Sequence, residues 1–147
     1  MSMKERIGRD LKEAMKARDE QRLSTLRLLT AAMKNEEIGL GHSLNEVEVM
    51  AVVKRQVKAL KDALLSFRAG GRADLVSQTQ RELAVLGVYL PEELSDEALA
   101  SIVKEELESA GVTSKQDLGK VMGTVVQAVA GRADGNRVKE AVLAHLA

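Results

Sequence analysis

The residues of this chain that are best suited to binding chemistry lie in its last third, where glycines and basic side chains alternate. Two segments carry them, Gly119-Lys120-Val121-Met122-Gly123 and Gly131-Arg132-Ala133-Asp134-Gly135. A glycine inside a helical, apolar segment costs about 1 kcal/mol relative to alanine. Such a glycine usually marks a place where another backbone or a ligand comes too close for a side chain. Because no residue in these segments suits nucleophilic or acid–base chemistry, the pattern favours docking over catalysis.

The charges of the chain are separated locally although they cancel globally. Twenty-two basic residues balance twenty-two acidic ones, so no overall field attracts polyanions. Basic residues nevertheless outnumber acidic ones in the terminal segments. Phosphate contacts from basic side chains beside close-approach glycines suit a folded RNA backbone that is recognised by shape. The candidate contacts are Lys120, Arg132, Arg137 and Lys139, and the candidate close-approach glycines are Gly119, Gly123, Gly131 and Gly135.

A second group of basic residues, Lys54, Lys58 and Lys61, follows one face of a predicted helix. A stripe of this kind is most often a solvated face whose long aliphatic stems shield the edge of the core. We treat it as a secondary candidate surface for the same polyanion.

The sequence gives little support for metal binding, nucleotide binding or catalysis. The chain lacks cysteine, and His42 and His145 have no partner at metal-ligand spacing. Adjacent acidic residues such as Glu105-Glu106 point about 100° apart on a helix, which is typical of a solvated face. No nucleotide-binding loop or nucleophile elbow occurs. We therefore expect no catalytic residue, no metal and no cofactor. Phe67 and Tyr89 are the only aromatic residues, too few for a base-stacking platform.

The elements that must position these residues are helices throughout, because apolar residues recur at helical spacing. We expect an all-α protein with four helices before Pro91 and three after Ser95. The corresponding domains are 1–91 and 95–147. Pro91 is the only proline and turns the chain there. The seven predicted helices begin near Ile7, Leu23, Ser43, Leu75, Ser95, Ser114 and Asp134.

Two local patterns predict how the helices begin. Ser43 with Glu46 three residues later is typical of a capping box. The tetrapeptide Gly-Arg-Ala-Asp occurs at 71–74 and again at 131–134. In both copies we expect the glycine to end one helix and the aspartate to cap the next. A duplicated binding loop is the alternative, which is disfavoured because the flanking sequences do not repeat.

The N-terminal residues 1–6 include charges and lack the apolar segment of a signal peptide. No apolar run reaches membrane-spanning length. We therefore expect a soluble, cytoplasmic protein without membrane contact.

Four motifs, in this order, resemble those of the YqeY family, which is similar to the tail of GatB, a subunit of the glutamine-dependent aminoacyl-tRNA amidotransferase. They are Thr25-Leu26-Arg27-Leu28-Leu29-x-Ala31-Ala32-x-Lys34-Asn35, Tyr89-Leu90-Pro91-Glu92-Glu93-Leu94, Gly119-Lys120-Val121-Met122-Gly123 and Gly131-Arg132-Ala133-Asp134-Gly135. The resemblance covers essentially the whole chain. It implies an all-α protein with four helices followed by three.

The resemblance also implies tRNA as the partner, because the similar region of GatB helps to hold tRNA. An accessory role beside an aminoacyl-tRNA synthetase or amidotransferase follows. Two alternatives remain open. The chain can be a protein-interaction module that docks on such an enzyme without touching RNA. It can also be a component of a carbon–nitrogen ligase with glutamine as amido-N-donor, although its residues do not support that activity for the chain alone.

Overall fold

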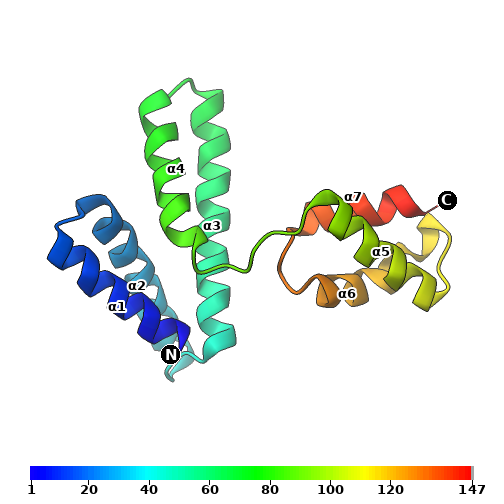
Figure 1. The fold of residues 1–147 in the computed structure, drawn as a ribbon, viewed down its shortest axis with the longest axis horizontal. Coiled ribbons are helices and arrows are strands. Elements are labelled where there is room, and N and C mark those ends of the chain that lie inside the picture. The colour runs from blue at the N-terminus through cyan, green and yellow to red at the C-terminus, as the bar shows by residue number, and fades with distance from the viewer. Residues whose placement is uncertain (147) are drawn as a thin grey trace. The chain divides into compact units, whose positions relative to one another are not determined.

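A computed structural model gives the fold, and it describes residues 1–146. The described chain is all-α, with seven α-helices, one short 3-10 turn and no strand (Figure 1). This confirms the predicted fold class and the four-plus-three order of helices. The elements are α1 (Met3–Ala17), α2 (Glu20–Leu40), α3 (Glu46–Ala69), α4 (Ala73–Gly87), α5 (Asp96–Ala110), η1 (Lys115–Asp117), α6 (Leu118–Val129) and α7 (Gly135–His145).

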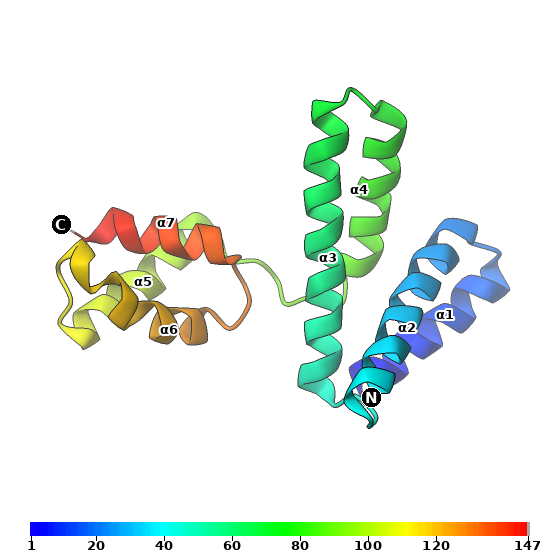
Figure 2. The ribbon, with the colours of Figure 1, turned by 180° about the vertical axis from the view of Figure 1, so that it is seen from behind.

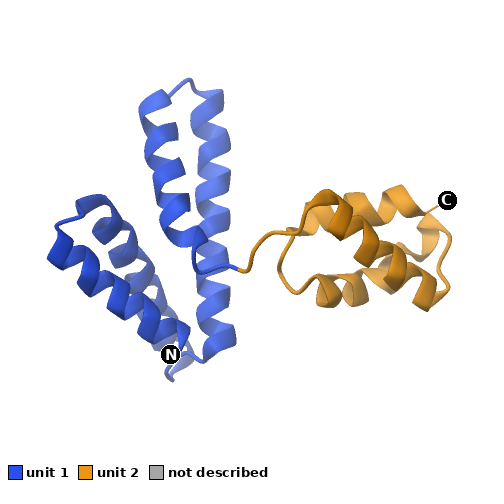
Figure 3. Ribbon diagram, viewed as in Figure 1, with its two compact units in different colours: residues 1–90 blue, residues 91–147 orange. Residues whose placement is uncertain are grey.

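The helices form two compact units (Figure 3). Unit 1 is Met1–Leu90 and holds α1 to α4, whereas unit 2 begins at Pro91 and holds α5 to α7. Each unit has a hydrophobic core of its own. The two units are therefore described separately.

Unit 1 consists of two helical hairpins, α1 with α2 and α3 with α4 (Figures 1 and 2). The first hairpin turns at Arg18, which has a left-handed backbone, and Asp19 then caps α2 by accepting a hydrogen bond from the Arg22 N–H. The second hairpin turns at Gly70 and Gly71. The largest fully buried side chains of the unit are Ile7, Leu26, Leu29, Val49 and Val53. Burial of each stabilises the fold by roughly 1.5 to 3 kcal/mol.

Unit 2 is a bundle in which α5, α6 and α7 all contact one another. Its fully buried side chains are Val103, Val121, Val125, Val129, Val138 and Val142. On α6, buried residues recur every four positions, at Val121, Val125 and Val129. Ser95 and Asp134 cap α5 and α7 as predicted, each accepting a backbone hydrogen bond from the residue three positions later.

Two predicted caps are wrong. The third helix begins two residues later than expected, and its capping box joins Asn45 with Glu48 rather than Ser43 with Glu46. Between these residues Leu44 is buried in the core of unit 1. Leu44 is therefore part of the segment before the helix. Asn45 and Glu48 offer a second capping box, and the helix begins after Asn45.

The first Gly-Arg-Ala-Asp segment also differs from the second. Arg72 occupies the N-cap of α4 without a side-chain cap, and Asp74 lies inside the first turn, where its carboxylate is 3.4 Å from the Arg72 guanidinium. Asp134 is a true N-cap, as expected. The identical tetrapeptides therefore serve different local roles, and only the second follows the prediction.

Candidate functional site

The predicted basic residues of unit 2 are divided between the two ends of α6. Lys120 lies in the first turn of α6, whereas Arg132 lies in the turn after its C-terminal end. At 1.5 Å per residue, roughly 15 Å or more of helix separates them. Lys139 is exposed on α7. The structure therefore spreads these side chains along the α6–α7 pair instead of gathering them in a pocket.

Lys120 has a partner but stays accessible. Its ammonium lies 3.2 Å from the Asp117 carboxylate, in a pair three residues apart, and 78% of its side chain is exposed. Exposed pairs of this kind contribute little to stability, so Lys120 remains free to exchange Asp117 for another anion.

Arg137 serves a different purpose. Its guanidinium donates hydrogen bonds to the carbonyl oxygen of Leu94, at 2.8 Å, and to the Asp96 carboxylate, at 3.0 Å. Only 27% of its side chain is exposed. The backbone of the same segment is held by a second bond, from the Leu94 N–H to the Arg132 carbonyl at 2.7 Å. Arg137 thus fastens the segment before α5 to the start of α7.

The four candidate glycines fall into two classes. A Cβ added at Gly119, Gly123 or Gly135 meets no atom within 4 Å, so nothing inside the unit requires glycine there. Gly131 has a φ of +77°, a left-handed conformation that favours glycine at the end of a helix. Gly131 is therefore explained by the fold, whereas Gly119 and Gly123 lie open on the outer face of α6.

That outer face of α6 also carries apolar surface. Val126 is 48% exposed, and at 100° per residue it shares a face with Gly119 and Gly123. The three residues, which we call the α6 glycine face, lack the protruding polar side chains of an ordinary solvated face.

The secondary basic residues lie on α3, at the outer face of unit 1. Lys54, Lys58, Lys61 and Arg68 are all exposed, and their spacing of four, three and seven residues keeps them on one side of the helix. We refer to these four residues as the α3 stripe. Arg55 points away from the stripe and pairs with Glu36 of α2 at 3.2 Å.

A buried polar cluster in unit 1 was missed by the sequence analysis. Asp10 is 5% exposed, and its carboxylate accepts a hydrogen bond of 2.6 Å from the Tyr89 hydroxyl. The guanidiniums of Arg9 and Arg22 lie 3.6 and 3.8 Å from the other oxygen of Asp10. The Arg6 guanidinium lies 5.0 Å from the centre of the Tyr89 ring. One signal was available in the sequence, since Asp10 interrupts the apolar face of Ile7, Leu11 and Ala14.

The hydrogen bonds and ion pairs of this cluster indicate a structural role. Burial raises the pKa of Tyr89, and the hydrogen bond to the Asp10 carboxylate acts in the same direction. The phenol therefore stays protonated and acts as a donor. Because the Asp10 carboxylate is occupied by Tyr89 and two guanidiniums, it offers no open catalytic position.

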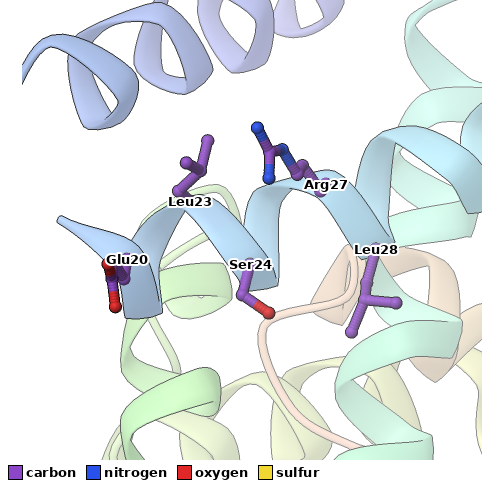
Figure 4. Close-up of a pocket in the computed structure, with 5 residues that line it drawn as sticks. All are labelled: Glu20, Leu23, Ser24, Arg27 and Leu28. Atoms are coloured by element: carbon purple, nitrogen blue, oxygen red, sulfur yellow. The ribbon is translucent and has the colours of Figure 1, made fainter. Parts of the chain in front are cut away.

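The surface hollows of the described chain are shallow. Five residues line one of them, all supplied by α2, with Leu23 and Arg27 on one side of the helix and Ser24 and Leu28 on the other (Figure 4). The second hollow lies in unit 2, and its lining is Lys104, Leu107, Glu108, Gly111, Val112, Thr113 and His145. Residues 1–146 contain no group of three or more metal-ligating side chains. His42 and His145 lie in different units, each beside a backbone carbonyl.

Within residues 1–146, no helix has the length and apolar character needed to cross a bilayer.

Comparison with known proteins assigns the chain to a family. Residues 4–146 match the family described as Yqey-like protein. The fungal protein called "Altered inheritance of mitochondria protein 41, mitochondrial" is a relative. Its form from Pyrenophora tritici-repentis is 29% identical over 130 residues, which cover 87% of this chain and 71% of that protein. The Saccharomyces cerevisiae form is 29% identical over 122 residues, which cover 79% of this chain and 66% of that protein.

A third form, from Lachancea thermotolerans, is 33% identical over 85 residues, which cover 57% of this chain and 46% of that protein. In each case the matched segment is shorter than the relative itself. The family match extends over nearly the whole chain and includes both helical units, and on that basis the chain belongs to the YqeY family.

Proposed function

We propose that this YqeY-family protein is an accessory protein that binds tRNA through its phosphate backbone and supports an aminoacyl-tRNA synthetase or amidotransferase. The observation that best supports this is the open α6 glycine face beside Lys120. Glycine inside a helix costs about 1 kcal/mol relative to alanine, and the space around Gly119 and Gly123 is empty within the unit. A partner that packs closely against α6 would account for both glycines.

A backbone-binding mode fits the side chains that are available. Tyr89 is buried against Asp10, which leaves no exposed tyrosine on which a base can stack. Recognition through phosphates and shape needs only cations and close approach. The motif resemblance to the GatB tail, a region that helps to hold tRNA, supports tRNA as the specific RNA.

The proposed contacts in unit 2 are Lys120, Arg132 and Lys139. Arg137 belongs to the predicted set of four, but its guanidinium is held by Leu94 and Asp96. We therefore assign Arg137 a supporting role, in which it positions the turn that carries Arg132.

A fluorescence titration of the full chain against total tRNA, repeated over a series of salt concentrations, tests the proposal. Binding through phosphates is weak, with a Kd on the order of 10⁻⁴ to 10⁻⁶ M at physiological salt, and strengthens steeply at low salt. The variant K120A/R132A/K139A is expected to lower the salt slope by about 2 to 3, at roughly 0.7 to 0.9 per phosphate contact.

The same salt series tests the tRNA-binding function and the assignment of its contact residues separately. Failure of the wild-type chain to bind tRNA at low salt contradicts the function. Unchanged binding by the triple variant leaves the function intact but removes these three residues as contacts.

A protein-interaction module is the second candidate, and the exposure of Val126 favours it. A helix of a partner protein could pack on the α6 glycine face without any RNA. Gly123→Ala should then stabilise the isolated chain by roughly 1 kcal/mol while weakening the partner interaction. A pull-down after ribonuclease treatment separates the candidates, because a direct protein contact survives the treatment and an RNA bridge does not.

An amidotransferase component is the third possibility. We expect no glutamine-dependent amidation of mischarged tRNA by the isolated chain, and an assay with radiolabelled glutamine checks this. We also propose that the chain acts in the cytoplasm. The relatives from Pyrenophora tritici-repentis and Saccharomyces cerevisiae are named as mitochondrial.

A further inference from the structure

The outer side of α2 carries apolar side chains that the core of unit 1 does not use. Leu28 is 63% exposed and Ile38 is 72% exposed, and Ala31 between them is also exposed. At 100° per residue the three lie within about 80° of one another, whereas the buried Leu29 and Met33 point toward the core. We call Leu28, Ala31 and Ile38 the α2 apolar face. A helix that is apolar on both its inner and its outer side is normally covered on both.

A surface hollow lies at the N-terminal end of this face. Leu23 and Arg27 line it on one side of α2, and Ser24 and Leu28 on the other (Figure 4). Because Ser24 is small, a second helix can approach the backbone of α2 between the longer side chains. Helices that bind in this way present apolar residues three and four positions apart.

The charges around the face are of both signs, with a basic excess. Other helices of unit 1 engage three of the charged residues of α2, in the pairs Arg22–Asp10, Glu36–Arg55 and Glu37–Lys4. The other three, Glu20, Arg27 and Lys34, are exposed. Arg27 and Lys34 lie along one edge of the apolar face, and Glu20 lies roughly 10 Å before Arg27 along the helix. An occupant of the face therefore meets two cations along its edge and one carboxylate at its end.

A second copy of α2 does not match this arrangement. In an antiparallel two-fold pair, the register that joins Glu20 to Lys34 of the other copy centres on residue 27, so the two Arg27 guanidiniums meet. The register that joins Glu20 to Arg27 centres between residues 23 and 24. Ala31 and Ile38 then extend past the start of the other α2 at Glu20. Neither register both covers the apolar face and pairs its charges.

RNA and a lipid surface also fit less well than a protein helix. A phosphate backbone can pair with Arg27 and Lys34, but it gives no apolar cover to Leu28 and Ile38. Helices that lie on membranes usually insert bulky residues such as tryptophan or phenylalanine, and α2 has no aromatic residue. A partner helix supplies both an apolar stripe and carboxylates beside it.

We propose that the α2 apolar face, together with Arg27 and Lys34, is a docking surface for an acidic amphipathic helix of a partner protein. The surface lies on unit 1 and includes none of the residues proposed to contact tRNA. It therefore stands or falls independently of the tRNA-binding function.

The test uses the full chain and two fluorescein-labelled helical peptides of about 18 residues, long enough to cover α2 from Ser24 to Ile38. Both peptides carry the same stripe of leucines, flanked by glutamates in one and by lysines in the other. Fluorescence anisotropy measures binding. We expect the glutamate peptide to bind and the lysine peptide to bind about tenfold or more weakly, because like charges then face each other. In an NMR titration with the glutamate peptide, the largest amide shifts should fall within residues 24–38.

The variant L28Q/I38Q removes the two large apolar side chains and keeps a good helix-forming residue. It should weaken binding of the glutamate peptide by about tenfold or more, since both side chains lose apolar burial. The matched control L65Q/V88Q replaces two apolar residues that are 65% and 55% exposed, and it should change the Kd by less than about twofold. R27Q/K34Q should reduce the preference for the glutamate peptide, whereas the control K12Q/R81Q should retain it. Circular dichroism and thermal unfolding establish that the variants are folded.

Several results would overturn the proposal. These are no binding of the glutamate peptide by the wild-type chain, equal binding of both peptides, and equal losses in L28Q/I38Q and L65Q/V88Q. A wild-type dimer that L28Q/I38Q dissociates would identify a second copy as the occupant. Loss of binding to tRNA, or to phosphatidylserine vesicles, in L28Q/I38Q would assign the face to RNA or to lipid. Failure of the wild-type chain to bind tRNA contradicts the proposed function alone, since the peptide titration does not involve RNA.

Discussion

At the scale of single residues, some polar side chains form hydrogen bonds with other segments of the same unit, whereas others face solvent. Asp10 and Tyr89 form a buried pair in unit 1, whereas the partly exposed Arg137 guanidinium of unit 2 binds the Leu94 carbonyl and the exposed Asp96 carboxylate. Each interaction joins segments that are distant in sequence. A buried hydrogen-bonding group that loses its partner carries a desolvation cost, so loss of the Tyr89 hydrogen bond should cost more stability than loss of the partly exposed Arg137 contacts.

Tyr89→Phe is expected to destabilise the chain by about 1.5 to 3 kcal/mol, the usual contribution of a hydrogen bond to a charged group. Urea unfolding measures this, and Ser24→Ala, an exposed hydroxyl on α2, should change the free energy of unfolding by less than about 0.5 kcal/mol. An equally small change in the free energy of unfolding for Tyr89→Phe and Ser24→Ala would mean that the Tyr89 hydroxyl contributes no net stability.

The raised pKa of Tyr89 gives this prediction a pH dependence. The fold favours the neutral phenol, so its contribution is complete below the ordinary tyrosine pKa of about 10 and is lost as the pH rises above that value. Between about pH 9 and 11, the wild-type chain should therefore lose more stability than Tyr89→Phe. Parallel decline of the two proteins would show that Tyr89 does not titrate with unfolding.

Arg137→Ala and Lys139→Ala separate a structural cation from a surface cation on the same helix. Loss of Arg137 leaves the Leu94 carbonyl without its side-chain donor and should cost about 0.5 to 1.5 kcal/mol, the usual contribution of a hydrogen bond that is only partly buried. Lys139→Ala should stay within about 0.5 kcal/mol. Thermal unfolding of the full chain checks both, and a stability loss in Lys139→Ala that matches Arg137→Ala would contradict the assignment of roles.

At the scale of the elements, the helices are set mainly by the period of their apolar residues, while their ends depend on competition between neighbouring caps. The start of α3 shows this best. Ser43 and Asn45 are both good N-cap residues, and each is followed by a glutamate three positions later. Leu44 lies between the two, outside the helix, and is buried in the core of unit 1, and the cap that forms is Asn45, the one that follows it.

Asn45→Ala should therefore destabilise the chain by about 0.5 to 2 kcal/mol, the usual range for loss of an N-cap. Ser43→Ala, which removes the cap predicted from the sequence, should have an effect below about 0.5 kcal/mol. Chemical denaturation of the two variants under the same conditions decides between the caps. A larger loss for Ser43→Ala would restore the earlier start of the helix.

At the scale of the whole molecule, two units with separate cores are joined in one chain. Unit 1 ends at Leu90 and unit 2 begins at Pro91, between the last turn after α4 and the N-cap of α5. The segment includes Pro91, which cannot donate a backbone hydrogen bond. Chain junctions with few regular backbone bonds are the usual sites of first cleavage.

Limited digestion with a glutamate-specific protease is expected to cut first at Glu92 or Glu93 and to yield one fragment for each unit. Mass spectrometry of early time points identifies the fragments, and the variant E92Q/E93Q should remain intact for longer. Initial cleavage inside α5, which has several glutamates of its own, would indicate that α5 opens more readily than the junction.

The sequence alone was enough to predict the all-α class, the four-plus-three order of helices and the caps at Ser95 and Asp134. These features depend on residues within one or two helical turns of each other, so apolar period and capping chemistry reveal them. It also singled out Lys54, Lys58 and Lys61 as a stripe, because spacing along one helix decides which side chains share a face.

Only the tertiary structure decided which polar residues form hydrogen bonds within the protein and which remain exposed for contact with a partner. Tyr89 and Asp10 are 79 residues apart, and Arg137 lies 43 residues from Leu94. No local pattern connects positions so distant, because their pairing depends on how separate helices pack. That packing assigns Arg137 to the fold and leaves Gly119, Gly123 and the α3 stripe exposed to whatever the protein binds.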